Sequence, residues 1–157
     1  MGRICSESGD IMPQFTTSTE LKCSAAVLRE YLGQTGKLPT ISNPDLQLTV
    51  ISAPEIVAAN TEIEFQISAY GLKQTMKHRY TVADHDRIVA EQIDGPTRSW
   101  VHTQTIEETE SGCVLTDIID FEPPGGMVGY VMTEARIRES LEEGMEFRYE
   151  ALAEILE

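Results

Sequence analysis

The chain has 157 residues, of which 41% are hydrophobic and 24% are charged, and this is typical of one soluble globular domain with its own core. Twelve basic against 26 acidic residues give a formal net charge of −14, which disfavours binding to nucleic acid and to anionic membrane surfaces. No segment has about 18 consecutive apolar residues and no secretion signal is visible, so we expect no stable membrane insertion. We predict a cytoplasmic protein that is a monomer or a homodimer.

The cysteines and the standard motifs exclude several classes of site. Cys5, Cys23 and Cys113 are widely spaced and form no C-x-x-C pair, which excludes a zinc ribbon and a thioredoxin-type site and favours reduced, structural thiols. The sequence also has no phosphate-binding glycine loop, no dinucleotide-binding glycine pattern and no H-E-x-x-H zinc motif. We therefore predict no metal and no cofactor.

The N-terminal part predicts a strand followed by a short helix. Residues 1–12 show no periodicity, so we expect a flexible leader before a single domain over residues 13–157. Gln14–Lys22 alternates polar and apolar side chains, which indicates a strand. Ser24 is suited to cap a helix over Ala25–Leu32.

The middle of the sequence predicts a meander of antiparallel strands. Two prolines indicate a loop over Lys37–Asp45 that has room for one short helical turn. Glu62–Tyr70 alternates apolar and polar side chains, which is the pattern of a half-buried antiparallel strand. Further strands are predicted at Leu46–Ile51, Gln74–Ala83, Arg87–Ile93, Arg98–Glu108 and Cys113–Phe121.

The C-terminal part predicts one amphipathic helix of about 30 residues that starts at Met127, after a Pro- and Gly-rich turn. Its buried stripe consists of Val131, Glu134, Ile137, Leu141, Met145, Arg148, Leu152 and Ile155, and glutamates cover the opposite face. Arg148 lies on the buried side, so we expect a carboxylate or strand carbonyls to pair with it as a structural anchor.

This order of elements predicts an α+β fold in which the helix buries its stripe against the sheet. The sheet is the only surface large enough to cover that stripe. A strongly curved sheet separates from the helix at one end and leaves a gap there. We expect this gap to be the place where a ligand binds.

Several motifs resemble a known superfamily. They are Gly95-Pro96, Trp100-x-His102, Gly112 with Asp117 five positions later, and Phe121-x-Pro123-x-Gly125. This pattern resembles the START-like (SRPBCC, helix-grip) superfamily, and within it the polyketide cyclase or coenzyme Q-binding-like group. The resemblance extends over Gln14–Glu157. Thr97 and Ala90 depart from the group, which commonly has an aromatic and an acidic residue at these positions.

The resemblance implies a curved seven-stranded antiparallel sheet wrapped around the long C-terminal helix over a deep cavity. It also implies a carrier or sensor that binds a small hydrophobic molecule, lipid-like, isoprenoid or polyketide-like, without chemistry. One fold hosts several functions in this superfamily, so two alternatives stay open. The first is an aromatase/cyclase-like enzyme that uses His102 and Asp117 as an acid/base pair. The second is an interaction protein whose own side chains fill the cavity.

Alternation along the strands predicts the candidate site. Gln92, His102 and Asp117 are expected to form a polar group on an otherwise apolar wall. This group would orient a ligand, act as acid and base, or only satisfy its own hydrogen bonds and tie the strands together. The predicted ligand-binding residues are Phe65, Ile67, Met76, His78, Tyr80, Gln92, Trp100, His102, Gln104, Asp117, Ile119, Phe121, Val131 and Glu134.

Overall fold

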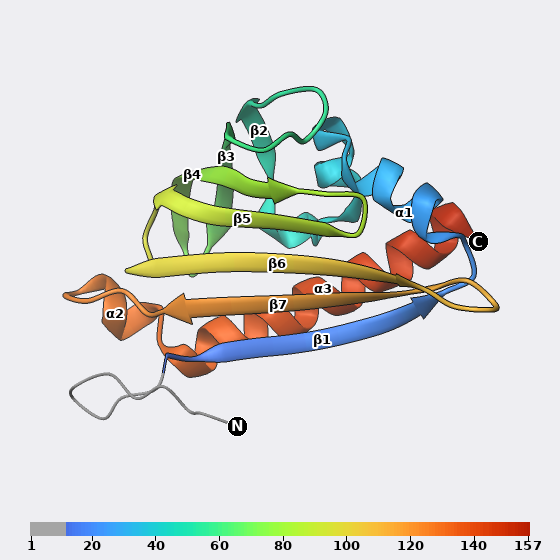
Figure 1. Ribbon diagram of the computed structural model, residues 1–157. Coiled ribbons are helices and arrows are strands. Elements are labelled where there is room, and N and C mark those ends of the chain that lie inside the picture. Colours follow the sequence, from blue (N-terminus) through green and yellow to red (C-terminus); the bar gives the residue numbers. More distant parts are fainter. Residues whose placement is uncertain (1–11) are drawn as a thin grey trace.

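The computed structural model describes residues 12–157, which form a curved sheet and a long C-terminal helix (Figure 1). The strands are β1 (Gln14–Leu21), β2 (Thr49–Ser52), β3 (Thr61–Ala69), β4 (Leu72–Ala83), β5 (Arg87–Asp94), β6 (Ser99–Glu108) and β7 (Cys113–Glu122). The α-helices are α1 (Ala25–Leu32), α2 (Val128–Val131) and α3 (Glu134–Leu156), and the 3-10 helices are η1 (Thr35–Ile41) and η2 (Pro44–Leu46). Cys5 and all but the last residue of the predicted leader lie outside the described residues.

The sheet confirms the predicted α+β class with seven antiparallel strands. Its order is β1-β7-β6-β5-β4-β3-β2, and every neighbouring pair is antiparallel. Strands β2 to β7 follow one another as a meander, and β1 adds to the sheet beside β7. Along β7 every second side chain is buried, which turns Leu115, Asp117 and Ile119 toward the interior.

Helix α3 packs along the concave side of the sheet, as the helix-grip prediction requires (Figure 1). Its apolar face enters two clusters of the core. The cluster near its C-terminal end contains Leu115 and Leu152, and the cluster near its start contains Ile119 and Ile137. Tyr149 packs against both clusters, so this residue lies where the two halves of the core meet.

The prediction of one helix from Met127 is wrong, because the chain leaves the helical conformation between α2 and α3. Met132 has φ −94° and ψ 68°, and Thr133 is extended. The Thr133 side chain accepts a hydrogen bond from the backbone N–H of Arg136 at 3.3 Å and caps a new helix. Helix α3 has 23 residues, and no helix of residues 12–157 is long and apolar enough to cross a bilayer.

The segment before β2 is more helical than predicted. Lys37–Asp45 was expected to be a loop with one helical turn, whereas most of it lies in η1 and η2. Gln47 then adopts a left-handed conformation with φ 49°, so β2 begins at Thr49 rather than at Leu46. The predicted cap of α1 is confirmed, since the Ser24 hydroxyl accepts a backbone hydrogen bond of 3.2 Å.

Candidate functional site

A cavity of about 260 Å³ lies between the sheet and α3. Its walls come from β3 to β7, from the end of α1, from the η1–η2 segment and from one side of α3, and most of the lining side chains are apolar. The volume exceeds that of an engineered cavity of about 150 Å³ that binds benzene. The cavity therefore has room for a small organic molecule.

Most of the predicted ligand-binding residues lie on the wall of this cavity. They are Phe65, Ile67, Met76, His78, Tyr80, Gln92, Trp100, His102, Gln104 and Ile119. The alternation of side chains along the strands predicted these residues correctly, because β3, β4 and β6 turn every second side chain toward the cavity. The irregular register between β4 and β5 leaves His78 and Tyr80 on the same face.

The structure places Asp117, Phe121, Val131 and Glu134 away from the cavity wall. Asp117 is fully buried, and Phe121 is fully buried in the core cluster near the start of α3. The prediction for Val131 and Glu134 assumed one uninterrupted helical period. Because the helical conformation is interrupted before α3, Glu134 lies in the first turn of α3 and is exposed. Its carboxylate accepts a hydrogen bond from Arg138 Nε at 3.0 Å.

The predicted site missed several wall residues, among them Gln74 and the residues of α3. Gln74 is one step of the β4 alternation before Met76, so the strand pattern could have identified it. The wall residues of α3 are Ile137, Ser140, Leu141, Gly144, Met145 and Arg148. Their spacing of three and four residues is the helical period, and the predicted stripe contained several of them without assigning them to the cavity.

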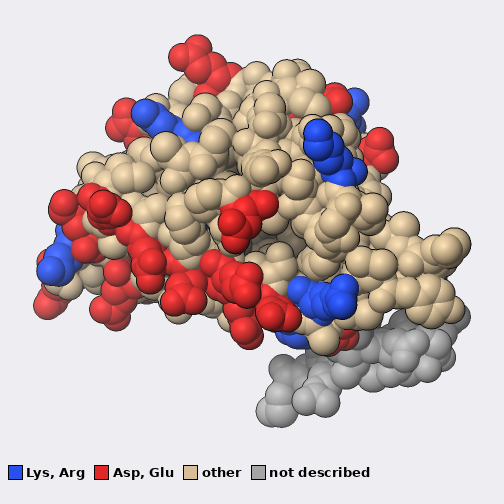
Figure 2. Space-filling view, turned by 180° about the vertical axis from the view of Figure 1, so that it is seen from behind, with Lys and Arg blue, Asp and Glu red and all other residues tan. Residues whose placement is uncertain are grey.

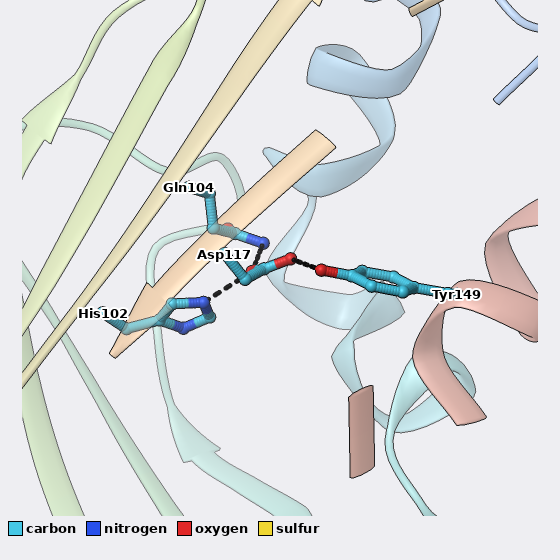
Figure 3. A network of polar contacts seen from close by, with 4 residues as sticks. All are labelled: His102, Gln104, Asp117 and Tyr149. Carbon is cyan, nitrogen blue, oxygen red and sulfur yellow. Dashed lines mark hydrogen bonds and ion pairs between the residues drawn. The ribbon is translucent and has the colours of Figure 1, made fainter. Parts of the chain in front are cut away.

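Asp117 is the centre of a hydrogen-bonded cluster behind the wall (Figure 3). Its Oδ1 accepts from His102 Nε2 at 2.6 Å and from Gln104 Nε2 at 3.1 Å, and its Oδ2 accepts from the Tyr149 hydroxyl at 2.7 Å. The predicted contact between His102 and Asp117 is therefore present. Tyr149 was not predicted, and it joins α3 to strands β6 and β7 through this carboxylate.

The cluster keeps Asp117 ionised. Burial raises the pKa of this carboxyl. The opposing effects are larger, so the pKa lies below its ordinary value; they are the hydrogen bond and charge of His102, the charge of Arg148 and the hydrogen bond of the Tyr149 hydroxyl. Burial and the adjacent carboxylate raise the pKa of Tyr149, so this hydroxyl keeps its proton. An ionised carboxylate only accepts hydrogen bonds, so His102 Nε2 is the donor in its contact with Asp117.

Gln92 does not join this cluster, so the predicted polar group of Gln92, His102 and Asp117 is wrong as one unit. The Gln92 amide donates to the Thr97 carbonyl at 2.7 Å, and the Thr97 hydroxyl donates to Gln92 Oε1 at 2.9 Å. These bonds close the turn that contains Gly95 between β5 and β6, and they use the polar atoms of Gln92 for structure.

Two other polar side chains on the wall have buried atoms without a hydrogen-bond partner. Gln74 Oε1 and His78 Nε2 are buried and have no hydrogen-bond partner among the described residues. The two residues are only 8% and 9% exposed, so water outside the cavity does not replace the missing partners. Burial, with a smaller contribution from His102, lowers the pKa of His78 to about 4, so its ring is neutral at neutral pH. Unpaired buried polar atoms are rare and costly, which makes this part of the wall unusual.

The cavity adjoins an open hollow at the surface. The cavity opens between η2, the β3–β4 turn and α3, because the two share Asn43, Leu46, Ala69, Tyr70 and Ser140. Figure 2 shows this hollowed face and the acidic side chains that gather along the helix. The exposed glutamates of α3 are Glu134, Glu139, Glu142, Glu143, Glu146, Glu150 and Glu154.

Comparison with known proteins identifies the fold. No protein-family model matches the sequence, and no curated protein matches it. Among solved structures, the major latex-like protein 151 from Panax ginseng has a TM-score of 0.69 at 16% identity, over 93% of this chain and 98% of that one. A protein from Chromobacterium violaceum has a TM-score of 0.71 at 14% identity, over 91% and 96% of the two chains.

A START superfamily protein from Mycobacterium smegmatis has a TM-score of 0.66 at 13% identity, over 91% of this chain and 96% of that one. At these identities the likeness concerns the fold. It agrees with the curved antiparallel sheet, the strand order and the C-terminal helix described above. The chain has a START-like, helix-grip fold.

Proposed function

We propose that the protein binds a small hydrophobic molecule, lipid-like, isoprenoid or polyketide-like, in the cavity between the sheet and α3, as a carrier or sensor. The cavity of about 260 Å³ with its largely apolar wall is the observation that carries this proposal. Each 100 Å² of apolar ligand surface that leaves water contributes roughly 2.5 kcal/mol, so apolar burial supplies the affinity. The START-like fold and its resemblance to ligand-binding proteins support the same function.

Gly144 offers a direct test, because it lies on the cavity wall and an added Cβ there has no neighbour within 4 Å. We expect Gly144→Leu to fold and to fill part of the cavity, so that the neutral fluorescent probe N-phenyl-1-naphthylamine binds at least about tenfold more weakly, the equivalent of 1.4 kcal/mol. Gly144→Ala is the matched control and should bind the probe like the wild type. Equal binding by all three proteins would place the probe elsewhere and refute the proposal.

Native mass spectrometry of freshly purified protein addresses the natural ligand. A stoichiometric apolar compound that is released on denaturation, and that is missing from Gly144→Leu, would identify its class. If no compound from a panel of lipids and aromatic polyketides raises the melting temperature, the interaction-protein alternative gains the support that the binding proposal loses. A ligand at about 100 times its Kd should stabilise the fold by roughly 2.7 kcal/mol.

A second candidate function rests on the 2.6 Å contact of His102 with Asp117 and on the place of His102 in the wall. In the neutral ring, Nδ1 would remove a proton from a methylene between two carbonyls of a poly-ketone. The enolate carbon would then form a bond to another carbonyl carbon of the same molecule. The ring would return the proton to that oxygen, which gives a cyclic hydroxyketone without an oxidant or reductant.

His102→Ala separates the two functions. An aromatase/cyclase-like enzyme should lose conversion of a synthetic triketone while its Kd for the triketone changes only a few-fold. His85→Ala, at a side chain that is 92% exposed, should retain conversion. If the wild type converts no triketone above the rate in buffer, or if binding and conversion fall together in His102→Ala, the enzymatic role is refuted.

A further inference from the structure

Arg148 is a half-buried cation on the cavity wall. The sequence predicted a carboxylate or strand carbonyls as its anchor, but within residues 12–157 its guanidinium has no hydrogen bond and no ion pair. A guanidinium has five N–H donors, and those of Arg148 lie at the cavity without being fully buried. No acceptor of the described residues engages them, so they can bind an acceptor that enters the cavity.

The buried carboxylate of Asp117 does not serve as the partner of Arg148. The charge of Arg148 helps to lower the pKa of Asp117, so the two groups are within electrostatic range. Both oxygens of Asp117 are engaged by His102, Gln104 and Tyr149, and no contact to Arg148 is formed. The N–H donors of Arg148 therefore remain available to a molecule in the cavity.

The wall around Arg148 offers further unpaired polar groups. The charge of Arg148 also acts on Tyr80, whose hydroxyl has no hydrogen bond among the described residues although the residue is only 6% exposed. Burial raises the pKa of Tyr80 to about 12, so its hydroxyl stays a donor. His78, two residues before Tyr80 on the same face, and Gln74 have the buried unpaired atoms described above. The unpaired polar atoms thus lie on one strand, β4, and on α3.

We propose that the ligand of this cavity is a carboxylate-bearing amphiphile, whose carboxylate pairs with Arg148 and accepts a second hydrogen bond from Tyr80. This inference rests on the proposed binding function and names the chemical class of its ligand. The planar fork of a guanidinium matches a carboxylate with two parallel hydrogen bonds, which a hydroxyl or an ester carbonyl cannot form. The apolar remainder of the molecule would occupy the space lined by Phe65, Met76 and Trp100.

The exposed glutamates of α3 repel an anionic ligand, but this repulsion is weaker than the attraction of Arg148 inside the cavity. The glutamates are exposed, and at physiological ionic strength their field decays over a Debye length of about 8 Å. A contact inside the cavity is screened much less. The glutamates therefore slow the approach of an anion, whereas Arg148 decides the affinity once the ligand is bound.

The test compares carboxylic acids with primary alcohols of equal chain length, eight to twelve carbons, as competitors of N-phenyl-1-naphthylamine at physiological ionic strength. We expect the wild type to bind the acid about tenfold more tightly than the alcohol of the same length. Arg148→Met should abolish this preference and leave the affinity for the alcohol unchanged, and Arg148→Lys should restore part of it. Arg87→Met is the matched control, because Arg87 is exposed on β5 and its loss changes the net charge equally.

The outcomes separate this inference from the proposed function. If neither acids nor alcohols displace the probe, or if the probe does not bind, the binding function itself fails. If both classes displace it with equal affinity in the wild type, the protein binds apolar molecules and the carboxylate inference is refuted. A preference for the acid that survives in Arg148→Met, in a variant whose circular dichroism matches the wild type, also refutes it.

Discussion

Two polar regions of this molecule lie close together and differ in how their hydrogen bonds are satisfied. Around Asp117, three donors engage both carboxylate oxygens, and the Asp117 side chain has no contact with solvent. On the cavity wall, Gln74 and His78 have buried atoms without partners. The first region has the properties of a structural tie between helix and sheet. In the second, polar atoms remain that could form hydrogen bonds but have no partner among the described residues.

Burial alone therefore does not distinguish a structural polar group from a ligand-binding one. A buried group that is fully paired contributes to one defined packing of the fold. A buried group that is unpaired lowers stability unless a ligand pairs with it. Single substitutions in each of the two regions test this division.

Asp117→Ala should cost the most stability, because it leaves donors from His102, Gln104 and Tyr149 buried without an acceptor. We expect a loss of about 3–5 kcal/mol in the free energy of unfolding, measured by urea denaturation. Asp120→Ala is the matched control on the other face of the same strand, and it should cost less than about 1 kcal/mol. Equal losses of stability in the two variants would show that the Asp117 cluster does not hold α3 against the sheet.

The lowered pKa of His78 should make the free energy of unfolding depend on pH. Its folded pKa of about 4 lies below the ordinary value of 6.5, so between these values the unfolded chain binds a proton that the folded chain does not. Stability from this group is therefore fully present above pH 6.5 and falls by about 3 kcal/mol as the pH decreases to 4. The one charge identified as acting on this ring is that of His102.

His78→Phe should remove this slope, since phenylalanine does not titrate and can keep the edge-on packing against Phe65, now at 5.0 Å between ring centroids. Urea denaturation of both proteins from pH 4 to pH 7 measures the difference. His85→Phe, at a side chain that is 92% exposed, should leave the slope as in the wild type. A slope that survives in His78→Phe would assign it to other groups.

Tyr149→Phe should weaken the tie between α3 and the sheet by about 2 kcal/mol, because it removes one of three hydrogen bonds to a buried carboxylate. Thermal unfolding and urea denaturation both report this loss. Tyr130→Phe is the control, since that residue is 85% exposed. Hydrogen exchange in α3 should increase in Tyr149→Phe alone, and unchanged exchange would contradict the proposed tie.

Arg148→Met should have the smallest effect on the ligand-free protein, within about 0.5 kcal/mol of the wild type or slightly stabilising. The substitution removes a half-buried charge that has no partner among the described residues and replaces it with an apolar side chain of similar length. The adjacent Tyr149→Phe variant provides the contrast in the same urea experiment. A loss of 2 kcal/mol or more would assign Arg148 to the structural region.

Local patterns predicted much of the fold and part of the site. Alternation in β3 and β4 placed Phe65, Met76 and His78 on one face, because side-chain direction in a strand depends only on position along that strand. The cap of α1 was predicted at Ser24 for a similar reason, since its partner is in the same turn. The helix boundary failed because a periodic apolar pattern continued across the break at Thr133.

The strands, the amphipathic character of the last helix and the face of most predicted wall residues could be predicted from the sequence, since each depends on near neighbours in the chain. The folded arrangement was needed to show that Tyr149 donates to Asp117, which is 32 residues away, and that Gln92 donates to the Thr97 carbonyl. It also leaves Arg148 at the cavity with no hydrogen-bond or ion-pair partner within residues 12–157. Such pairings depend on how the sheet curves against the helix, and that geometry arises from contacts that no local period encodes.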